Sequence, residues 1–104
     1  MPQDDILTGV VLDEVALTVE DLAQACAVES RWVVERAEAG LLGSTSVKSM
    51  EWRFVSADLA RARRLAVLER DFDANQELAA LVVDLIEEVG RLRARLRAAG
   101  LPAD

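Results

Sequence analysis

The segment Leu17–Leu42 constrains the fold more than any other part of the chain, because it reads as two short helices joined by a tight turn. Thr18 is a favourable N-cap residue, and Asp21 stands three residues later, where it completes a capping box. The helix that begins there would bury an apolar face made of Val19, Leu22, Ala23 and Cys26. This spacing of three and four residues is typical of an amphipathic helix.

A second helix is expected after a break at Ala27–Val28. Ser30 is predicted to cap this helix, and Val33 and Ala37 would form its buried face. Gly40 marks its end, because glycine accepts the left-handed backbone that commonly follows a helix. Two short helices in this arrangement form a helix-turn-helix, a motif that normally places its second helix in the major groove of DNA.

The charges of the second helix do not suit a nucleic-acid reader. Two bases stand against three acids in it: Arg31 and Arg36 against Glu29, Glu35 and Glu38. The chain has a net charge of −7, and residues 1–55 hold ten acidic and four basic residues. Small DNA-binding domains usually present a basic face, because phosphate neutralisation supplies most of their affinity. An acidic front half favours a basic protein surface as partner, and a solvated surface with no partner is the alternative.

Composition argues against several classes of function. The chain has no His and a single cysteine, Cys26, so an internal disulfide is excluded and a reducing cytoplasm is expected. Carboxylate pairs such as Asp13-Glu14 have no His, Tyr or phosphate-binding loop beside them and indicate solvated charges. The acidic start does not fit a secretory signal, and no apolar run approaches the ~20 residues that cross a bilayer. We therefore expect a cytoplasmic protein that is not an enzyme and has no cofactor, metal, membrane contact or small-molecule substrate.

Short strands are expected on either side of the two helices. Residues 6–17 form a β-rich apolar run. After a turn-rich link at 43–49, apolar and polar residues alternate through Met50, Trp52 and Phe54. Alternation with a period of two indicates a strand, so the pattern predicts a small β-hairpin or wing behind the second helix.

A third helix is predicted to follow the wing. The helix is predicted to begin at Ser56, with Asp58 in its first turn. Its apolar stripe consists of Leu59, Ala62, Leu65 and Ala66, and Leu68 or Glu69 lies beside this stripe. The polar, turn-prone residues at 71–75 mark its end.

The strongest local pattern lies in a last helix, predicted from about Gln76 to Ala99. Its apolar residues follow the alternating spacing of a coiled-coil seam at Val82, Leu85, Val89, Leu92 and Leu96. Where the helix packs on the domain, the apolar face would be widened by Leu78, Leu81 and Ile86. Glu88 and Arg93 fall where a parallel pair of helices forms cross-chain ion pairs, so a homodimer is expected. A helix that folds back onto its own domain is the alternative.

These elements describe one domain with a modest core. The chain divides into an N-terminal lead with a possible short strand at 1–16, a helix-turn-helix with wing and following helix at 17–74, and a C-terminal helix at 75–104. The predicted fold is mostly α, a winged helix-turn-helix with a small β-wing and a long C-terminal helix that joins two chains.

This order of elements resembles the MerR type of winged helix. In the MerR motif, Gly-Leu comes twelve residues after a valine. This chain has the same spacing at Val28, Val33 and Gly40-Leu41. The Arg-Tyr-Tyr run with which MerR proteins grip the DNA backbone falls here on Val34, Glu35 and Arg36. The resemblance implies a MerR-like fold and leaves a DNA-binding transcriptional regulator as the alternative function, although these three residues make a poor phosphate grip.

A narrower resemblance covers most of the chain, from about Leu17 to Leu96. Three segments carry it by their order and spacing: Trp52-Arg53-Phe54, the stretch from Arg64-Leu65 to Arg70-Asp71-Phe72, and LVVDLI at 81–86. Together they are similar to the CbpM chaperone-modulator family. Its members bind the J-domain of the DnaJ-like co-chaperone CbpA and inhibit it. The resemblance implies a J-domain as the partner here and argues against nucleic acid as the ligand.

The acidic charges agree with what that resemblance implies. J-domains stimulate a DnaK-type ATPase through a basic helix, which an acidic helix-turn-helix face would cover. The predicted partner-binding residues are Glu20, Asp21, Glu29, Trp32, Glu35 and Glu38. Trp32 is the candidate for a buried anchor and Trp52 the second aromatic candidate, with a place in the core as the alternative for both. An oligomerising adaptor for an unrelated basic protein would use the same acidic face.

Overall fold

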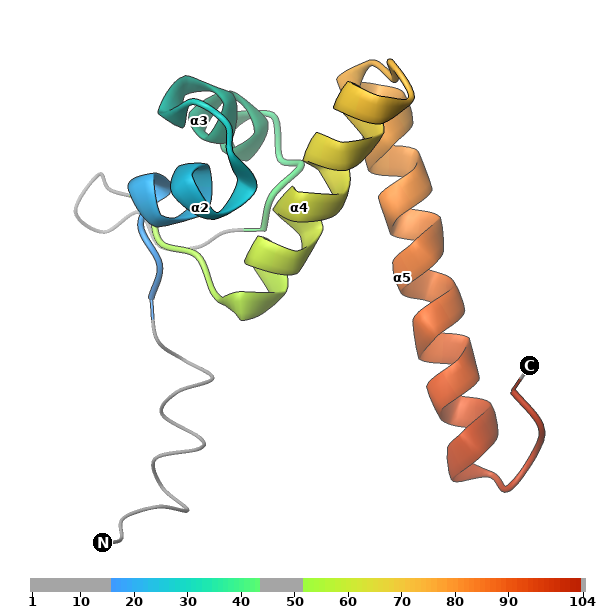
Figure 1. Ribbon diagram of the computed structural model, residues 1–104. Coiled ribbons are helices and arrows are strands. Elements are labelled where there is room, and N and C mark those ends of the chain that lie inside the picture. Colours follow the sequence, from blue (N-terminus) through green and yellow to red (C-terminus); the bar gives the residue numbers. More distant parts are fainter. Residues whose placement is uncertain (1–15, 44–51, 104) are drawn as a thin grey trace, which may run out of the picture.

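The computed structural model describes residues 16–43 and 52–103, and within these ranges the chain forms four helices. They are α2 (Val19–Cys26), α3 (Ser30–Glu38), α4 (Ser56–Asp71) and α5 (Gln76–Ala98). Figure 1 shows α2 and α3 on one side of α4 and the long α5 on the other side. The prediction of a mostly helical chain with a long last helix is confirmed, and α4 is the element that connects its two sides.

Side chains cap two of the helix starts. The Thr18 hydroxyl accepts from the Asp21 N–H at 3.0 Å and the Asp21 carboxylate accepts from the Thr18 N–H at 2.9 Å, which confirms the predicted capping box. The Asn75 side chain caps α5 through the third helical N–H, at 2.8 Å. The predicted cap at Ser30 is wrong. Glu29 has the extended backbone of an N-cap residue, Ser30 is already helical, and no side-chain hydrogen bond caps α3.

The start of α4 lies at Ser56, as predicted. Its N-cap residue Val55 has no side-chain acceptor, but the Asp58 carboxylate reaches back and accepts from the Val55 N–H at 2.9 Å. Asp58 is buried, and a Cβ on the loop residue Gly43 would lie 2.7 Å from Oδ1 of Asp58. Any larger residue at position 43 would therefore push the Asp58 carboxylate out of its place at the first turn of α4.

Both helices of the helix-turn-helix end in a left-handed residue. Gly40 closes α3 with a φ of 79°, and the N–H after it donates to the Arg36 carbonyl at 2.8 Å. The predicted end of this helix is therefore confirmed. At the end of α2, Ala27 takes the same conformation with a φ of 58°, and the next N–H donates to the Ala23 carbonyl at 3.0 Å. An L-residue with a Cβ is strained in this region, so the turn costs α2 some stability.

The described residues do not confirm the predicted β-wing. They contain one isolated antiparallel bridge, in which the Leu17 N–H donates to the Phe54 carbonyl at 2.7 Å and the reverse bond measures 2.9 Å. The alternation through Trp52 and Phe54 does not extend into a strand here, because Val55 is already the N-cap of α4. Met50, residues 44–49 and residues 1–15 lie outside the described residues.

The core lies where α2, α3 and α4 meet, with one side of α5 added. Its largest fully buried side chains are Leu22, Val33, Phe54, Leu65 and Val83. The predicted buried faces of α2, α3 and α4 are confirmed, except that Val19 and Leu59 are only partly buried. Trp52 is also partly buried, and its ring stacks on that of Phe54 with centroids 6.3 Å apart.

The face of α5 that packs on the domain differs from the prediction. Leu78, Leu81 and Ile86 are exposed, and the residues buried against the rest of the chain are Ala79, Ala80 and Val83. Small side chains let two helix backbones approach closely, which explains why an alanine face meets α4 rather than a leucine face. Beyond Gly90 the helix runs away from the domain (Figure 1), and residues 90–98 are all exposed.

Within residues 16–43 and 52–103, none of the helices is long and apolar enough to span a membrane.

Candidate functional site

The outward face of α3 carries three of the charges that the sequence singled out. Arg31, Glu35 and Glu38 are exposed, whereas Val33 and Ala37 of the same helix are buried on the opposite side. The helical repeat of 3.6 residues places Glu38 one turn after Glu35 on the solvent side. This face therefore presents two carboxylates and one guanidinium, and the Glu35 carboxylate also pairs with Nη1 of Arg36 at 3.2 Å.

The remaining predicted acids lie at helix starts. Glu29 is exposed at the N-cap of α3, and Glu20 is exposed in the first turn of α2. Asp21 is exposed too, but its carboxylate is bound to the N-cap backbone. A substitution of Asp21 would change the stability of α2 as well as the surface charge, so Glu35 and Glu38 are better positions for testing a partner surface.

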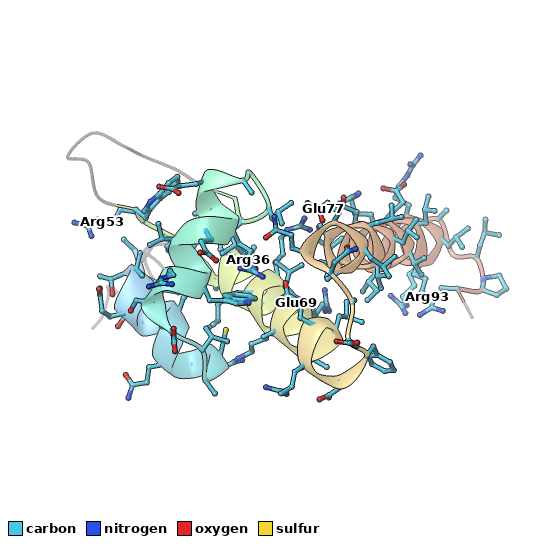
Figure 2. The ribbon with its side chains drawn as sticks, turned by 90° about the horizontal axis from the view of Figure 1, so that it is seen from above. Arg36, Arg53, Glu69, Glu77 and Arg93 are labelled. Carbon is cyan, nitrogen blue, oxygen red and sulfur yellow. The ribbon has the colours of Figure 1, made fainter. Side chains whose placement is uncertain are left out.

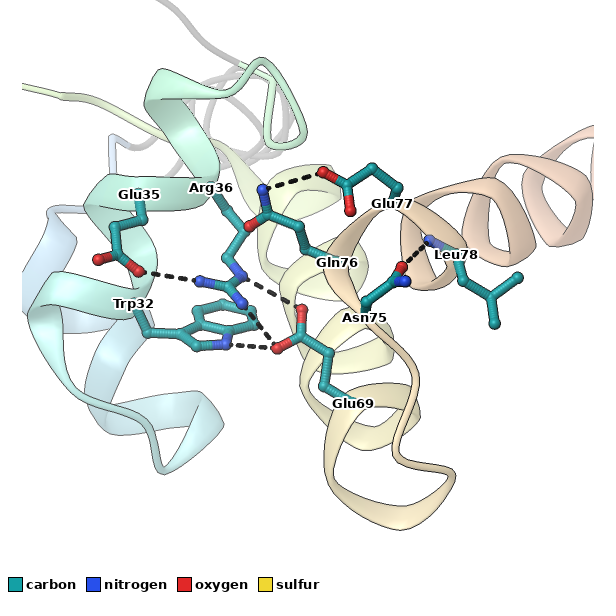
Figure 3. A network of polar contacts seen from close by, with 8 residues as sticks. All are labelled: Trp32, Glu35, Arg36, Glu69, Asn75, Gln76, Glu77 and Leu78. Carbon is teal, nitrogen blue, oxygen red and sulfur yellow. Dashed lines mark hydrogen bonds and ion pairs between the residues drawn. The ribbon is translucent and has the colours of Figure 1, made fainter.

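Trp32 and Arg36 turn from α3 toward α4 and meet Glu69. The Trp32 Nε1–H donates to Oε1 of Glu69 at 2.9 Å, and Arg36 donates to both oxygens, from Nη2 at 2.8 Å and from Nε at 3.2 Å. The guanidinium carbon also lies 4.6 Å from the centroid of the Trp32 ring. Figure 3 shows this cluster, here called the Glu69 clamp (Trp32, Arg36 and Glu69), at the contact between the two helices.

The Glu69 clamp changes what α3 presents to solvent. The Arg36 side chain is 12% exposed and the Glu69 side chain 16%, so the positive charge is paired and mostly covered. Viewed from above in Figure 2, Arg36 and Glu69 lie between the helices. Trp32 is partly buried and its only polar group is bound within the chain. Trp32 was predicted to be a partner-binding anchor, with a place in the core as the alternative. Its position fits the alternative, because it holds α3 against α4.

Arg61 forms a second polar cluster, on the other side of α4. Its guanidinium pairs with Asp84 at 2.9 Å and with Glu87 at 3.2 Å, and its Nε donates to the Leu41 carbonyl. The cluster joins the loop after α3 to the middle of α5. It borders a hollow of about 800 Å³ between α4, α5 and this loop, where Arg64 stands among charges of both signs.

Five apolar residues form an exposed stripe along α5. Val82 is partly buried at its start, and Leu85, Val89, Leu92 and Leu96 are 56%, 44%, 45% and 38% exposed. These are the residues of the predicted seam, and the structure places them on one side of the helix, where the described residues leave the four after Val82 exposed. Beside them, a hydrogen bond to Glu88 raises the pKa of the Arg91 guanidinium.

Cys26 is the only cysteine of the chain, and it lies in the core at the end of α2. Burial raises the pKa of its thiol above the ordinary value, and Arg63 partly opposes this effect. A neutral thiol in this place is a packing residue. In the part of the chain that the structure describes, no group of three His, Cys, Asp or Glu side chains could hold a metal ion.

Sequence reasoning missed the part played by Glu69. The residue is separated from Arg36 by 33 positions, and no local pattern links them. One signal was present, because Glu69 continues the spacing of the apolar stripe of α4 through Ala62, Leu65 and Ala66. An acid on the buried side of a helix needs a partner that donates hydrogen bonds.

Comparison with known proteins agrees with the helix-turn-helix geometry. Residues 17–99 match the family model of the MerR HTH family regulatory proteins. The Chaperone modulatory protein CbpM of Coxiella burnetii is 27% identical over 93 residues, which cover 88% of each chain. Proteins of the same name from Pseudomonas entomophila and Pseudomonas putida are 30% and 32% identical over 79 residues, which cover 76% of this chain and 78% of theirs. This chain therefore belongs to the CbpM family and matches the MerR HTH family model over most of its length.

Proposed function

We propose that this protein is a chaperone modulator that binds the J-domain of a DnaJ- or CbpA-like co-chaperone. Binding would cover the basic helix of the J-domain and prevent it from stimulating a DnaK-type chaperone. The observation that carries the proposal is the outward face of α3, where Glu35 and Glu38 are exposed while Arg36 is mostly covered and its charge is shared between Glu69 and Glu35. The name of the relatives, chaperone modulatory protein, supports the same class of function.

The proposed mechanism is steric and electrostatic, with no reaction catalysed, no cofactor and a place in the cytoplasm. Exposed carboxylates attract a basic surface over a distance of about one Debye length and accelerate association. The main affinity comes from what is desolvated at the centre of the interface. On α3 this centre would lie between Glu35 and Glu38, with Glu29 and Glu20 as charges at the rim.

A MerR-like DNA-binding regulator is the second candidate, because the family model that matches the chain is that of regulatory proteins. The side chains of α3 argue against it. At the three positions of the MerR backbone grip, Val34 is partly buried, Glu35 is an exposed acid and Arg36 is bound to Glu69. Arg31 is then the one exposed base of the helix, and a single guanidinium gives little affinity for a polyanion.

The protein is also proposed to act as a homodimer, paired through Val82, Leu85, Val89, Leu92 and Leu96. Large apolar side chains that stay exposed in a continuous stripe usually mark an interface. The charges of α5 favour an antiparallel pair over the parallel pair expected above. Residues 76–90 contain four acids and no base, whereas residues 91–98 contain four arginines and no acid. An antiparallel pair places these oppositely charged halves side by side, whereas a parallel pair would place like charges together.

The proposal is tested by titrating the protein against a purified J-domain of a CbpA-like protein, with random-sequence duplex DNA as the parallel ligand. The variant Glu35→Lys with Glu38→Lys should bind the J-domain more than about tenfold more weakly at low salt, because two attractive charges become repulsive. The control is Asp71→Lys with Asp73→Lys, which makes the same change of net charge at exposed positions away from α3 and from the stripe of α5.

An equal loss for both pairs of substitutions would show that net charge, and not the α3 face, governs binding. A wild-type protein that binds duplex DNA and not the J-domain would replace the modulator function by the regulator function.

A further inference from the structure

The Glu69 clamp joins α3 to α4 through a carboxylate that accepts three hydrogen bonds. One comes from Trp32 and two from Arg36, at distances between 2.8 and 3.2 Å. Hydrogen bonds between a guanidinium and both oxygens of a carboxylate fix the geometry of the pair as well as its distance. Arg36 is therefore held in one orientation against the Trp32 ring, and its Nη1 also pairs with Oε1 of Glu35 at 3.2 Å.

The charge of Arg36 matters because this residue stands on the helix that would meet a partner. It is the only base at the three positions where MerR proteins carry their Arg-Tyr-Tyr grip, and it is one of two bases on α3. Arg36 lies between two carboxylates, Glu69 and Glu35, so without the charge of Glu69 its whole positive charge would be left to neutralise Glu35. Because the pair with Glu69 is mostly covered, solvent and salt screen it less than they would screen an exposed pair.

We propose that Glu69 is a specificity-determining residue of the α3 surface. By neutralising Arg36, it leaves Glu35 with its net negative charge on the surface that meets the partner, and α3 then prefers a cationic protein surface to a phosphate backbone. The inference rests on the proposed function in one respect, that α3 is the surface that meets the partner. Glu69 itself is a positioning residue, since it acts through Arg36.

The test uses Glu69→Gln in the full-length protein. Glutamine keeps an acceptor oxygen for the Trp32 Nε1–H, so the helices stay joined while the compensating charge is lost. The matched control is Glu87→Gln, which removes the charge of another carboxylate that pairs with an arginine, at 3.2 Å from Arg61. Both variants change the net charge equally. Amide NMR spectra establish that each variant keeps the wild-type fold.

Two ligands separate this inference from the proposed function: the J-domain and a short oligolysine peptide, which probes charge alone. At low ionic strength, Glu69→Gln should weaken the binding of both to α3 by about threefold, and Glu87→Gln should leave both unchanged. The double variant Arg36→Gln with Glu69→Gln removes the freed positive charge as well and should restore the wild-type affinity. A purely structural role of Glu69 predicts no such restoration.

Equal effects of Glu69→Gln and Glu87→Gln, or a double variant that stays as weak as Glu69→Gln, would overturn the inference. A wild-type protein that binds oligolysine on α3 but not the J-domain would refute the proposed partner. In that case the oligolysine series still decides whether Glu69 sets the charge preference of α3.

Discussion

Helices α3 and α5 are both amphipathic, yet they use their apolar residues in different ways. In α3, Val33 and Ala37 are buried within the chain, and polar side chains are left for the solvent side. In α5, the residues buried within the chain are small, and larger ones such as Leu85 and Leu92 remain exposed. An apolar stripe in a sequence therefore does not reveal whether its partner lies inside the same chain. The size of the residues on each side of the helix gives a better indication.

The largest expected effect is the difference in stability between the loss of a core leucine and the loss of an exposed leucine on α5. Leu65→Ala should lower the free energy of unfolding by about 2–5 kcal/mol, because Leu65 is fully buried and leaves a cavity. Leu81→Ala should cost less than about 1 kcal/mol, since Leu81 is 54% exposed and lies outside the seam. Urea denaturation measures both values. Similar losses for the two variants would mean that α5 is covered in solution by something other than the described residues.

The next effect concerns the seam of α5. The wild-type protein should sediment as a dimer at tens of micromolar, and Leu92→Asp should sediment as a folded monomer. An aspartate in the seam would bury a charge without a partner, which should weaken association by at least about a hundredfold. Ala94→Asp introduces the same residue at an exposed position outside the seam and should leave the dimer intact. A monomeric wild type at these concentrations would contradict the pairing.

A smaller effect is expected at the start of α2. Thr18→Ala removes one half of the capping box and should cost about 1 kcal/mol of stability. Ser30→Ala should be close to neutral, because no side-chain hydrogen bond caps α3. The urea midpoints of the two variants provide the comparison. If Ser30→Ala proved as costly as Thr18→Ala, the assignment of Glu29 as the N-cap residue of α3 would be wrong.

The smallest effect is a gain in stability at the turn between α2 and α3. Ala27→Gly should stabilise the protein by about 0.5–1 kcal/mol. Glycine adopts the left-handed conformation without strain, and this gain exceeds the cost of its larger conformational entropy in the unfolded state. Ala39→Gly is the matched variant at the end of α3. It should destabilise the protein, since Ala39 has a φ of −80° and gains nothing from glycine. Thermal unfolding shows the opposite signs as a raised and a lowered Tm.

The features that were predictable from sequence are local ones. The ends of α4 and the region of α5 were indicated by Ser56, by the polar break at 71–75 and by a periodicity that continues to Ala98. Such signals depend on residues three or four positions apart, which a sequence displays directly. The capping box at Thr18 and the left-handed Gly40 belong to the same class.

The features that escaped prediction depend on residues far apart in the chain. The alanine face of α5 could be chosen only once the distance between α4 and α5 was known. In the candidate site, Glu35 and Glu38 were identified correctly as charges of α3, and the structure places both on its exposed side. That Arg36 is mostly covered, and pairs with a second carboxylate besides Glu35, depends on Glu69, which contributes from another helix.

The contact between Trp32 and Glu69 has a practical consequence. The chain contains two tryptophans, and the indole of Trp32 is bonded to a carboxylate from α4 beneath a guanidinium. Indole emission responds to nearby charges, so in a Trp52→Phe background any ligand that shifts α3 against α4 should change the fluorescence. The protein thus carries its own optical reporter for the helix pair, at the place where a partner is expected and without a dye on the surface.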